Sequence, residues 1–126
     1  TRLFRLRYTQ LEAIAAENPE VWRALSALAA EKCALAMDAA GELLIRDARK
    51  RLAAVMLRLA GHGARQLVAL PLAELVVGQT ELAQASNLSR SMVARLLSEF
   101  QDSGAIEIHY RRIVLCKITL LEQVVG

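Results

Sequence analysis

The residues best suited to binding chemistry lie between positions 90 and 100. Four apolar residues recur there at helical spacing and predict one buried helix face: Val93, Leu96, Leu97 and Phe100. The opposite face combines two arginines with small residues: Arg90, Ser91, Ala94, Arg95 and Ser98. A guanidinium can donate two hydrogen bonds to the O6 and N7 atoms of guanine, and small neighbours let a helix enter the major groove of DNA. An ordinary solvated helix face with two arginines is the alternative.

The segment leading into this helix predicts a helix-turn-helix. Residues 79–101 give two helices joined by a turn at residues 86–88, where Asn87 tolerates a positive φ. Ser89 is a suitable N-cap for the second helix, because its hydroxyl can accept from free amides of the first turn.

A basic hairpin is expected next. Residues 106–108 and 113–116 predict two strands around the turn 109–112. That turn holds three side chains that are, or can become, cationic: His109, Arg111 and Arg112. A winged helix-turn-helix sets such a hairpin, the wing, against the phosphate backbone beside the groove.

A long helix precedes these elements. Residues 20–59 contain one glycine, Gly41, and predict one helix or two helices broken near Gly41 or Asp47; the sequence 61–63 ends it. One stripe is apolar and rich in small side chains: Trp22, Leu25, Ala29, Cys33, Ala36, Ala40 and Leu43. The stripe predicts a homodimer seam between two helices, with packing inside one chain as the alternative.

Beyond the stripe lies a basic cluster, expected to be a solvated helix face or to contact DNA phosphates: Arg46, Arg49, Lys50, Arg51 and Arg58.

The chain opens on a pattern of period two. Phe4, Leu6 and Tyr8 alternate with arginines and predict a strand, and residues 11–17 predict a short helix that stops at Asn18 before Pro19. No second strand follows nearby, so we expect the chain to be the C-terminal part of a larger protein that supplies the rest of the sheet. The alternative is that this strand pairs with a dimer mate or with the distant hairpin.

Residues 66–70 and 75–77 predict a further small hairpin, whose second run could instead be helical.

Composition excludes several classes of protein. The 126 residues are 55% hydrophobic and 23% charged, which predicts a folded chain of about one domain, and 4% aromatic residues argue against a stacking RNA binder. The net charge of +3 permits an anionic partner. No apolar run has the length of a membrane span, and we expect a cytoplasmic protein.

The sequence offers no catalytic or metal-binding pattern. Cys33 and Cys116 are far apart and are expected to be buried free thiols, with no metal site. His62 and His109 have no nucleophile partner in the sequence pattern, so we expect no enzyme activity.

The run QTELAQASNLSRSMVARLLSEFQDSGAIEIHYRRIVL resembles the DNA-binding domain of bacterial Crp/Fnr transcription regulators, and residues 1–59 resemble the last β-roll strand and the dimerisation helix of that family. The resemblance implies a mainly α fold in which residues 1–60 are an effector-domain remnant with the dimerisation helix, and residues 61–126 form a winged helix-turn-helix with small β-hairpins. It implies a homodimer on a palindromic double-stranded DNA operator, with RNA polymerase as a further partner.

The resemblance also implies roles for individual residues. The family's base-reading positions match Arg90, Ser91 and Arg95. The family's phosphate-contacting positions match Gln79, Thr80, Ser89, His109 and Arg111. We expect Arg112, the next residue of the wing, to contact phosphate as well.

Two positions depart from the family pattern. Many members have glutamate where this chain has Ser91, which implies a different DNA half-site. Ala36 and Met37 stand where cAMP-binding members offer hydroxyl groups, so we expect an effector other than cAMP, or none, and no cofactor in this chain. The alternative function is a winged-helix module that binds a protein partner.

Overall fold

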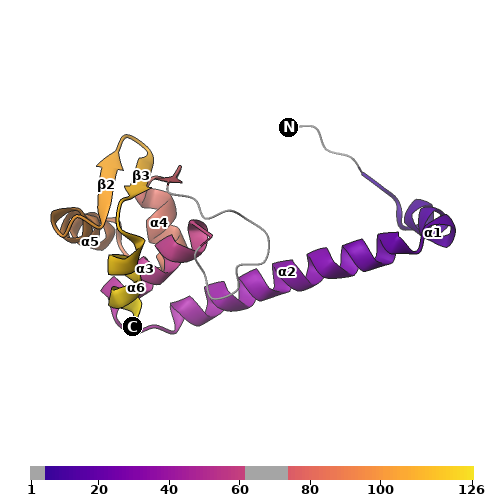
Figure 1. Ribbon diagram of the computed structural model, residues 1–126, viewed down its shortest axis with the longest axis horizontal. Coiled ribbons are helices and arrows are strands. Elements are labelled where there is room, and N and C mark those ends of the chain that lie inside the picture. Colours follow the sequence, from indigo (N-terminus) through magenta and orange to yellow (C-terminus); the bar gives the residue numbers. More distant parts are fainter. Residues whose placement is uncertain (1–4, 62–73) are drawn as a thin grey trace. The chain divides into compact units, whose positions relative to one another are not determined.

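The computed structural model describes residues 5–61 and 74–126, which form six helices and three short strands (Figure 1). Packing divides the chain into two compact units, Thr1–Leu35 and Ala36–Gly126. None of the helices in the described ranges is long and apolar enough to span a membrane.

The first unit holds α1, Tyr8–Glu17, and the beginning of α2, Glu20–Leu43. The strand predicted through Leu6 and Tyr8 is wrong over the described residues, since residues 5–7 are in no regular element and Tyr8 begins a helix. Phe4 lies outside the described residues. The Gln10 side chain accepts from the Arg7 amide at 3.0 Å, which fixes where α1 begins. The predicted helix end is confirmed, since Asn18 follows the last residue of α1.

The long predicted helix is two helices, α2 and α3, Ala48–Leu59, with the break directly before Asp47 rather than at Gly41. Asp47 is the N-cap of α3, and its carboxylate accepts from the Lys50 amide at 2.9 Å. This hydrogen bond lowers the pKa of Asp47 below its usual value. Gly61 follows α3 with a φ of 78°, the left-handed conformation that glycine adopts at helix ends.

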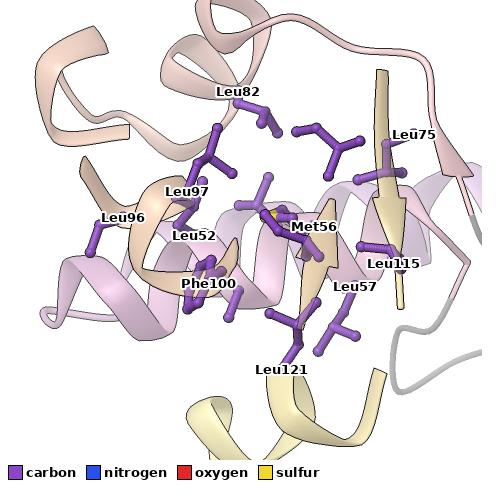
Figure 2. Packing of buried hydrophobic residues seen from close by; sticks show 14 of the residues in the cluster. Leu52, Met56, Leu57, Leu75, Leu82, Leu96, Leu97, Phe100, Leu115 and Leu121 are labelled. Atoms are coloured by element: carbon purple, nitrogen blue, oxygen red, sulfur yellow. The ribbon is translucent and has the colours of Figure 1, made fainter. Parts of the chain in front are cut away.

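The core of the second unit surrounds α3 (Figure 2). Leu52, Val55 and Met56 of α3 are fully buried. They pack with apolar side chains from every other element of the winged domain, among them Leu75, Leu82, Leu97, Phe100, Leu115 and Leu121. Hence α3, which the sequence analysis placed with residues 1–60, is part of the packing of the winged domain, whose compact unit begins at Ala36.

The helix-turn-helix is confirmed. Helix α4, Gln79–Ser86, and helix α5, Arg90–Asp102, are joined by a turn in which Asn87 has a φ of 50°. The Ser89 hydroxyl caps α5 by accepting from the Met92 amide at 3.2 Å. The Gly78 amide before α4 donates to the Glu81 carboxylate at 2.8 Å, which fixes where α4 begins.

The sheet has three antiparallel strands in the order β1, β3, β2. Strands β2, Ile106–His109, and β3, Arg112–Leu115, form the predicted wing, but His109 and Arg112 pair across the ladder, so the turn is shorter than expected. Strand β1, Glu74–Leu75, pairs with β3, and the expected strand at residues 66–70 lies outside the described residues.

Two further differences concern the C-terminal part and the cysteines. Helix α6, Ile118–Val125, was not predicted; it packs against α3 through the buried Leu121. Both cysteines are exposed rather than buried, because Cys33 lies on the outer surface of α2 and Cys116 directly follows the last residue of β3.

Candidate nucleic-acid interface

Helix α5 presents the two faces that its sequence predicts. Val93, Leu96, Leu97 and Phe100 are buried in the core, whereas Arg90, Ser91, Arg95 and Ser98 are exposed. The exposed face contains no large apolar side chain, so it is shaped for polar groups such as base edges and phosphates. Figure 1 shows α5 beside the β2–β3 hairpin.

A hollow of about 270 Å³ lies where α4, α5 and the wing meet. It is lined by five polar or basic side chains that the sequence analysis assigned to DNA: Gln79, Thr80, Arg90, His109 and Arg111. Gln79 and Thr80 come from the first turn of α4, where free amides and the helix dipole favour an anion. The fold therefore brings together four of the six predicted phosphate contacts with one predicted base-reading residue.

The wing tip consists of Tyr110 and Arg111. Tyr110 is 92% exposed, and Arg111 has a φ of 53°, a conformation that glycine or asparagine adopts more readily. An exposed residue in a strained conformation suits a position held for its charge. Tyr110 was not among the site residues predicted from the sequence.

The other two predicted wing contacts, Arg112 and His109, each lie near a carboxylate of the sheet. Nη1 of Arg112 lies 3.6 Å from Oε2 of Glu74, and Nε2 of His109 lies 3.5 Å from Oε2 of Glu107. Because Arg111 has no acidic neighbour among the ion pairs of the described residues, it is the wing residue with the most available charge.

Ser89 and Ser91 are linked at the start of α5. Their hydroxyl oxygens lie 3.1 Å apart, while that of Ser89 also caps the helix. Ser91 is thus held at the exposed N-terminal end of α5, the end that a recognition helix directs toward base edges.

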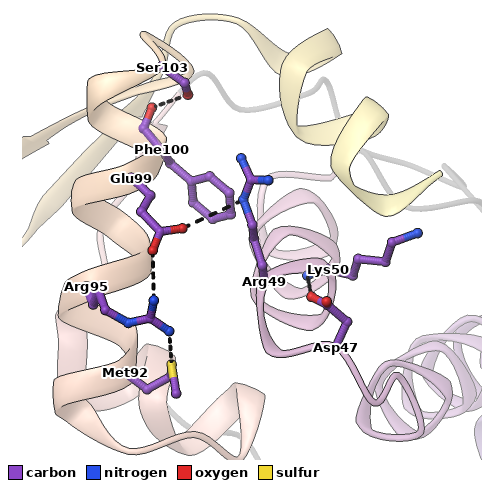
Figure 3. Close-up of polar contacts among 8 residues, drawn as sticks. All are labelled: Asp47, Arg49, Lys50, Met92, Arg95, Glu99, Phe100 and Ser103. Atoms are coloured by element: carbon purple, nitrogen blue, oxygen red, sulfur yellow. Dashed lines mark hydrogen bonds and ion pairs between the residues drawn. The ribbon is translucent and has the colours of Figure 1, made fainter.

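Arg95 is exposed but not free. Its Nη1 donates to Oε1 of Glu99 at 3.0 Å, and its Nη2 donates to the sulfur of Met92 at 3.0 Å (Figure 3). The helical spacings of i+4 and i−3 could have indicated both partners.

Four members of the basic cluster make structural contacts from α3, among them Lys50, whose Nζ donates to the carbonyl of Val125 at 3.4 Å. Nε of Arg58 donates to both carboxylate oxygens of Glu42, at 2.8 and 2.9 Å, and burial raises the pKa of Glu42. Arg51 donates to the carbonyl of Ile45 at 3.1 Å. Arg49 stacks over the Phe100 ring, 5.7 Å from its centroid. These contacts favour a structural role over phosphate binding.

The predicted dimer stripe of α2 is exposed along its length. Trp22 is 42% exposed and Leu43 is 44% exposed, and Leu25, Ala29, Cys33, Ala36 and Ala40 are also exposed. Three further apolar side chains on α2 are exposed but were not predicted as part of the stripe: Leu28, Leu35 and Met37. A surface of this composition suits a second helix.

Comparisons with known proteins agree on one kind of domain. A family model described as a Crp-like helix-turn-helix domain matches residues 50–124. A CRP-family transcriptional regulator from Thermus thermophilus is 25% identical, with a TM-score of 0.68, over 85% of this chain and 54% of its own. FixK2 from Bradyrhizobium japonicum is 22% identical, with a TM-score of 0.75, over 96% of this chain and 60% of its own. The chain thus spans little more than half of these solved structures. No curated protein matches it.

Proposed function

The chain belongs to the Crp/Fnr family of transcription regulators, through its Crp-like helix-turn-helix domain, and from this premise we propose that it binds double-stranded DNA in a sequence-specific manner. In this proposal α5 is the recognition helix. Arg90, Ser91 and Arg95 contact base edges in the major groove.

The remaining contacts position the domain on the phosphate backbone. Gln79, Thr80 and Ser89 would donate to phosphates beside the groove, and His109, Arg111 and Arg112 would do so from the wing. We assign no catalytic residue.

The hollow between α4, α5 and the wing is the observation that supports this function most strongly. It gathers Gln79, Thr80, Arg90, His109 and Arg111, which come from three elements, around one concave surface. A protein-binding module would instead be expected to expose apolar anchors on α5. The exposed residues of that face are charged or small, which favours DNA.

The same proposal covers assembly and regulation. The exposed stripe of α2 would form a homodimer with a second copy, so that two recognition helices bind a palindromic operator. We propose residues 1–60 as the effector-domain remnant with the dimerisation helix and residues 61–126 as the DNA-binding part, although α3 also packs within the latter. RNA polymerase is the further partner that the family suggests, and Ala36 and Met37 favour an effector other than cAMP, or none.

A salt titration of DNA binding tests this function. The affinity for random duplex should fall as salt rises, with a slope set by the number of phosphate contacts. Selection from a random duplex pool should then enrich one sequence, and Arg90→Ala should weaken binding to it, while Arg23→Ala on α2 should not. Absence of salt-dependent duplex binding by the wild-type chain would contradict the proposal.

A further inference from the structure

The carboxylate of Glu99 lies between two arginines from different helices (Figure 3). Its Oε1 accepts from Arg95 of α5 at 3.0 Å, and its Oε2 lies 3.9 Å from Nε of Arg49 on α3. The Arg95 side chain is 62% exposed on the face assigned to DNA. Arg49 is held elsewhere, with its guanidinium over the ring of the buried Phe100. One carboxylate therefore connects a DNA-facing cation to a cation that is stacked on the core.

These contacts hold the Arg95 guanidinium along the helix surface. Nη1 is bound to Glu99, one turn after Arg95, and Nη2 is bound to the sulfur of Met92, one turn before it. A two-pronged contact to guanine needs two donors of the same planar group directed at the base. Each terminal nitrogen keeps one further N–H, but the two contacts together hold the guanidinium along α5. Arg95 must therefore give up at least one of them to turn toward a base.

We propose that Glu99 is a specificity-determining residue, which holds Arg95 on α5 until a matching base pair displaces it. This inference rests on the proposed function. An exposed ion pair is weak, whereas a two-pronged contact to guanine is strong, so the exchange of partners is favourable at the matching base. A random sequence offers Arg95 mainly phosphates, which also repel the Glu99 carboxylate.

Arg49 is the positioning residue of this arrangement. When Arg95 turns to the DNA, the Glu99 carboxylate keeps a cationic neighbour at 3.9 Å, on a helix outside the proposed groove contact. The stacking on Phe100 keeps Arg49 in place. Without Arg49, release of Arg95 would leave the carboxylate with no cation beside it, so Glu99 would hold Arg95 more firmly.

The test compares affinities for the selected duplex and for random duplex in matched variants. Because Arg95 leaves Glu99 at the matching base pair, Glu99→Gln should raise the affinity for the selected duplex by about two- to fivefold. The rise for random duplex should be smaller, so the ratio of selected to random affinity increases. Arg49→Gln should weaken selected-site binding while Arg95 is present. Glu122→Gln on α6 removes the same charge outside this cluster and should leave the ratio unchanged.

A double-mutant cycle separates the mechanism from simple repulsion. If Glu99 acts through Arg95, the effect of Glu99→Gln on the ratio disappears in an Arg95→Ala background. Glu99→Asp keeps the charge but shortens the side chain, and should also raise the ratio; it serves as the second variant if Glu99→Gln unfolds. An effect that persists without Arg95, or that is equal for both duplexes, would overturn the inference. The proposed function fails only if the wild-type chain shows no salt-dependent duplex binding.

Discussion

Arg58 and Glu42 form a nearly buried ion pair between α3 and the end of α2, with Nε of Arg58 2.8 Å from Oε1 of Glu42. Their side chains are 17% and 11% exposed. The Glu20–Arg23 pair has the same 2.8 Å separation, but its side chains are 79% and 65% exposed for Arg23 and Glu20. The chain thus contains two ion pairs of equal length that differ in burial.

We predict that the buried pair matters far more for stability. Glu42→Ala would leave the Arg58 guanidinium without its partner in a poorly hydrated site, at a cost on the order of 3 kcal/mol in the free energy of unfolding. Glu20→Ala should change it by less than about 1 kcal/mol. Urea denaturation measures both, and equal losses would show that burial does not decide the strength of these pairs.

Ser89 allows helix capping and DNA binding to be separated. Ser89→Asp keeps an oxygen that can cap α5, so the melting temperature should stay near that of the wild type. The same carboxylate would lie against DNA phosphates and should weaken binding to every duplex by at least about tenfold. Ser89→Ala should instead lose about 1 kcal/mol of stability.

Thermal melts of both Ser89 variants measure the capping contribution, and duplex titrations measure the effect on DNA affinity. Unchanged DNA binding by Ser89→Asp would place the N-terminus of α5 away from the backbone.

We expect Arg111 to increase DNA affinity, although its backbone conformation does not favour stability. Arg111→Gly should leave the unfolding free energy unchanged or raise it by up to about 1 kcal/mol, because glycine adopts a φ of 53° without strain. The slope of log affinity against log salt should fall by about one unit.

Arg112→Ala is the matched comparison within the wing. The Glu74 carboxylate already balances part of the Arg112 charge at 3.6 Å, so this variant should reduce the slope less. A larger effect at Arg112 than at Arg111 would mean that the sheet face, and not the wing tip, meets the DNA.

The homodimer prediction depends on one face of α2. Replacing Ala29, Ala36 and Ala40 with glutamate should produce monomers, because charged side chains would have to be buried in the seam. Ala27→Glu adds a charge on the opposite side of the helix and should leave the dimer intact. Sedimentation of the full chain measures both. A wild-type chain that is already monomeric at high concentration would contradict a seam on this stripe.

Local rules predicted most of the winged domain. The spacing of Val93, Leu96 and Phe100 fixed the faces of α5, and Asn87 and Ser89 adopt the turn and cap conformations expected of them, because each depends on only a few neighbouring residues. Features that depend on distant packing were not predictable in this way. Helix α6 forms against α3, and the strand of Leu75 pairs with β3, almost forty positions later.

The candidate interface was predicted unevenly for the same reason. Residue types and a family resemblance identified Arg90, Arg95 and the wing. The pairing of Glu99 with Arg95 is local and could have been predicted from its spacing. The contacts of Glu99 with Arg49 and of Glu74 with Arg112 could not, because they join two helices and two strands. Such pairs appear only once the chain is folded.

The central claim is that α5 reads base pairs, and Arg95→Ala tests it most directly. Affinities should be measured for the selected duplex, for the same duplex with the guanine pair opposite Arg95 replaced, and for random duplex. The account predicts a loss on the order of 1 to 3 kcal/mol at the selected site, no further loss when that base pair is replaced, and little change with random duplex. Arg95→Lys should restore little, because an ammonium lacks the planar pair of donors. An equal loss with all three duplexes would make Arg95 a phosphate contact and contradict the account.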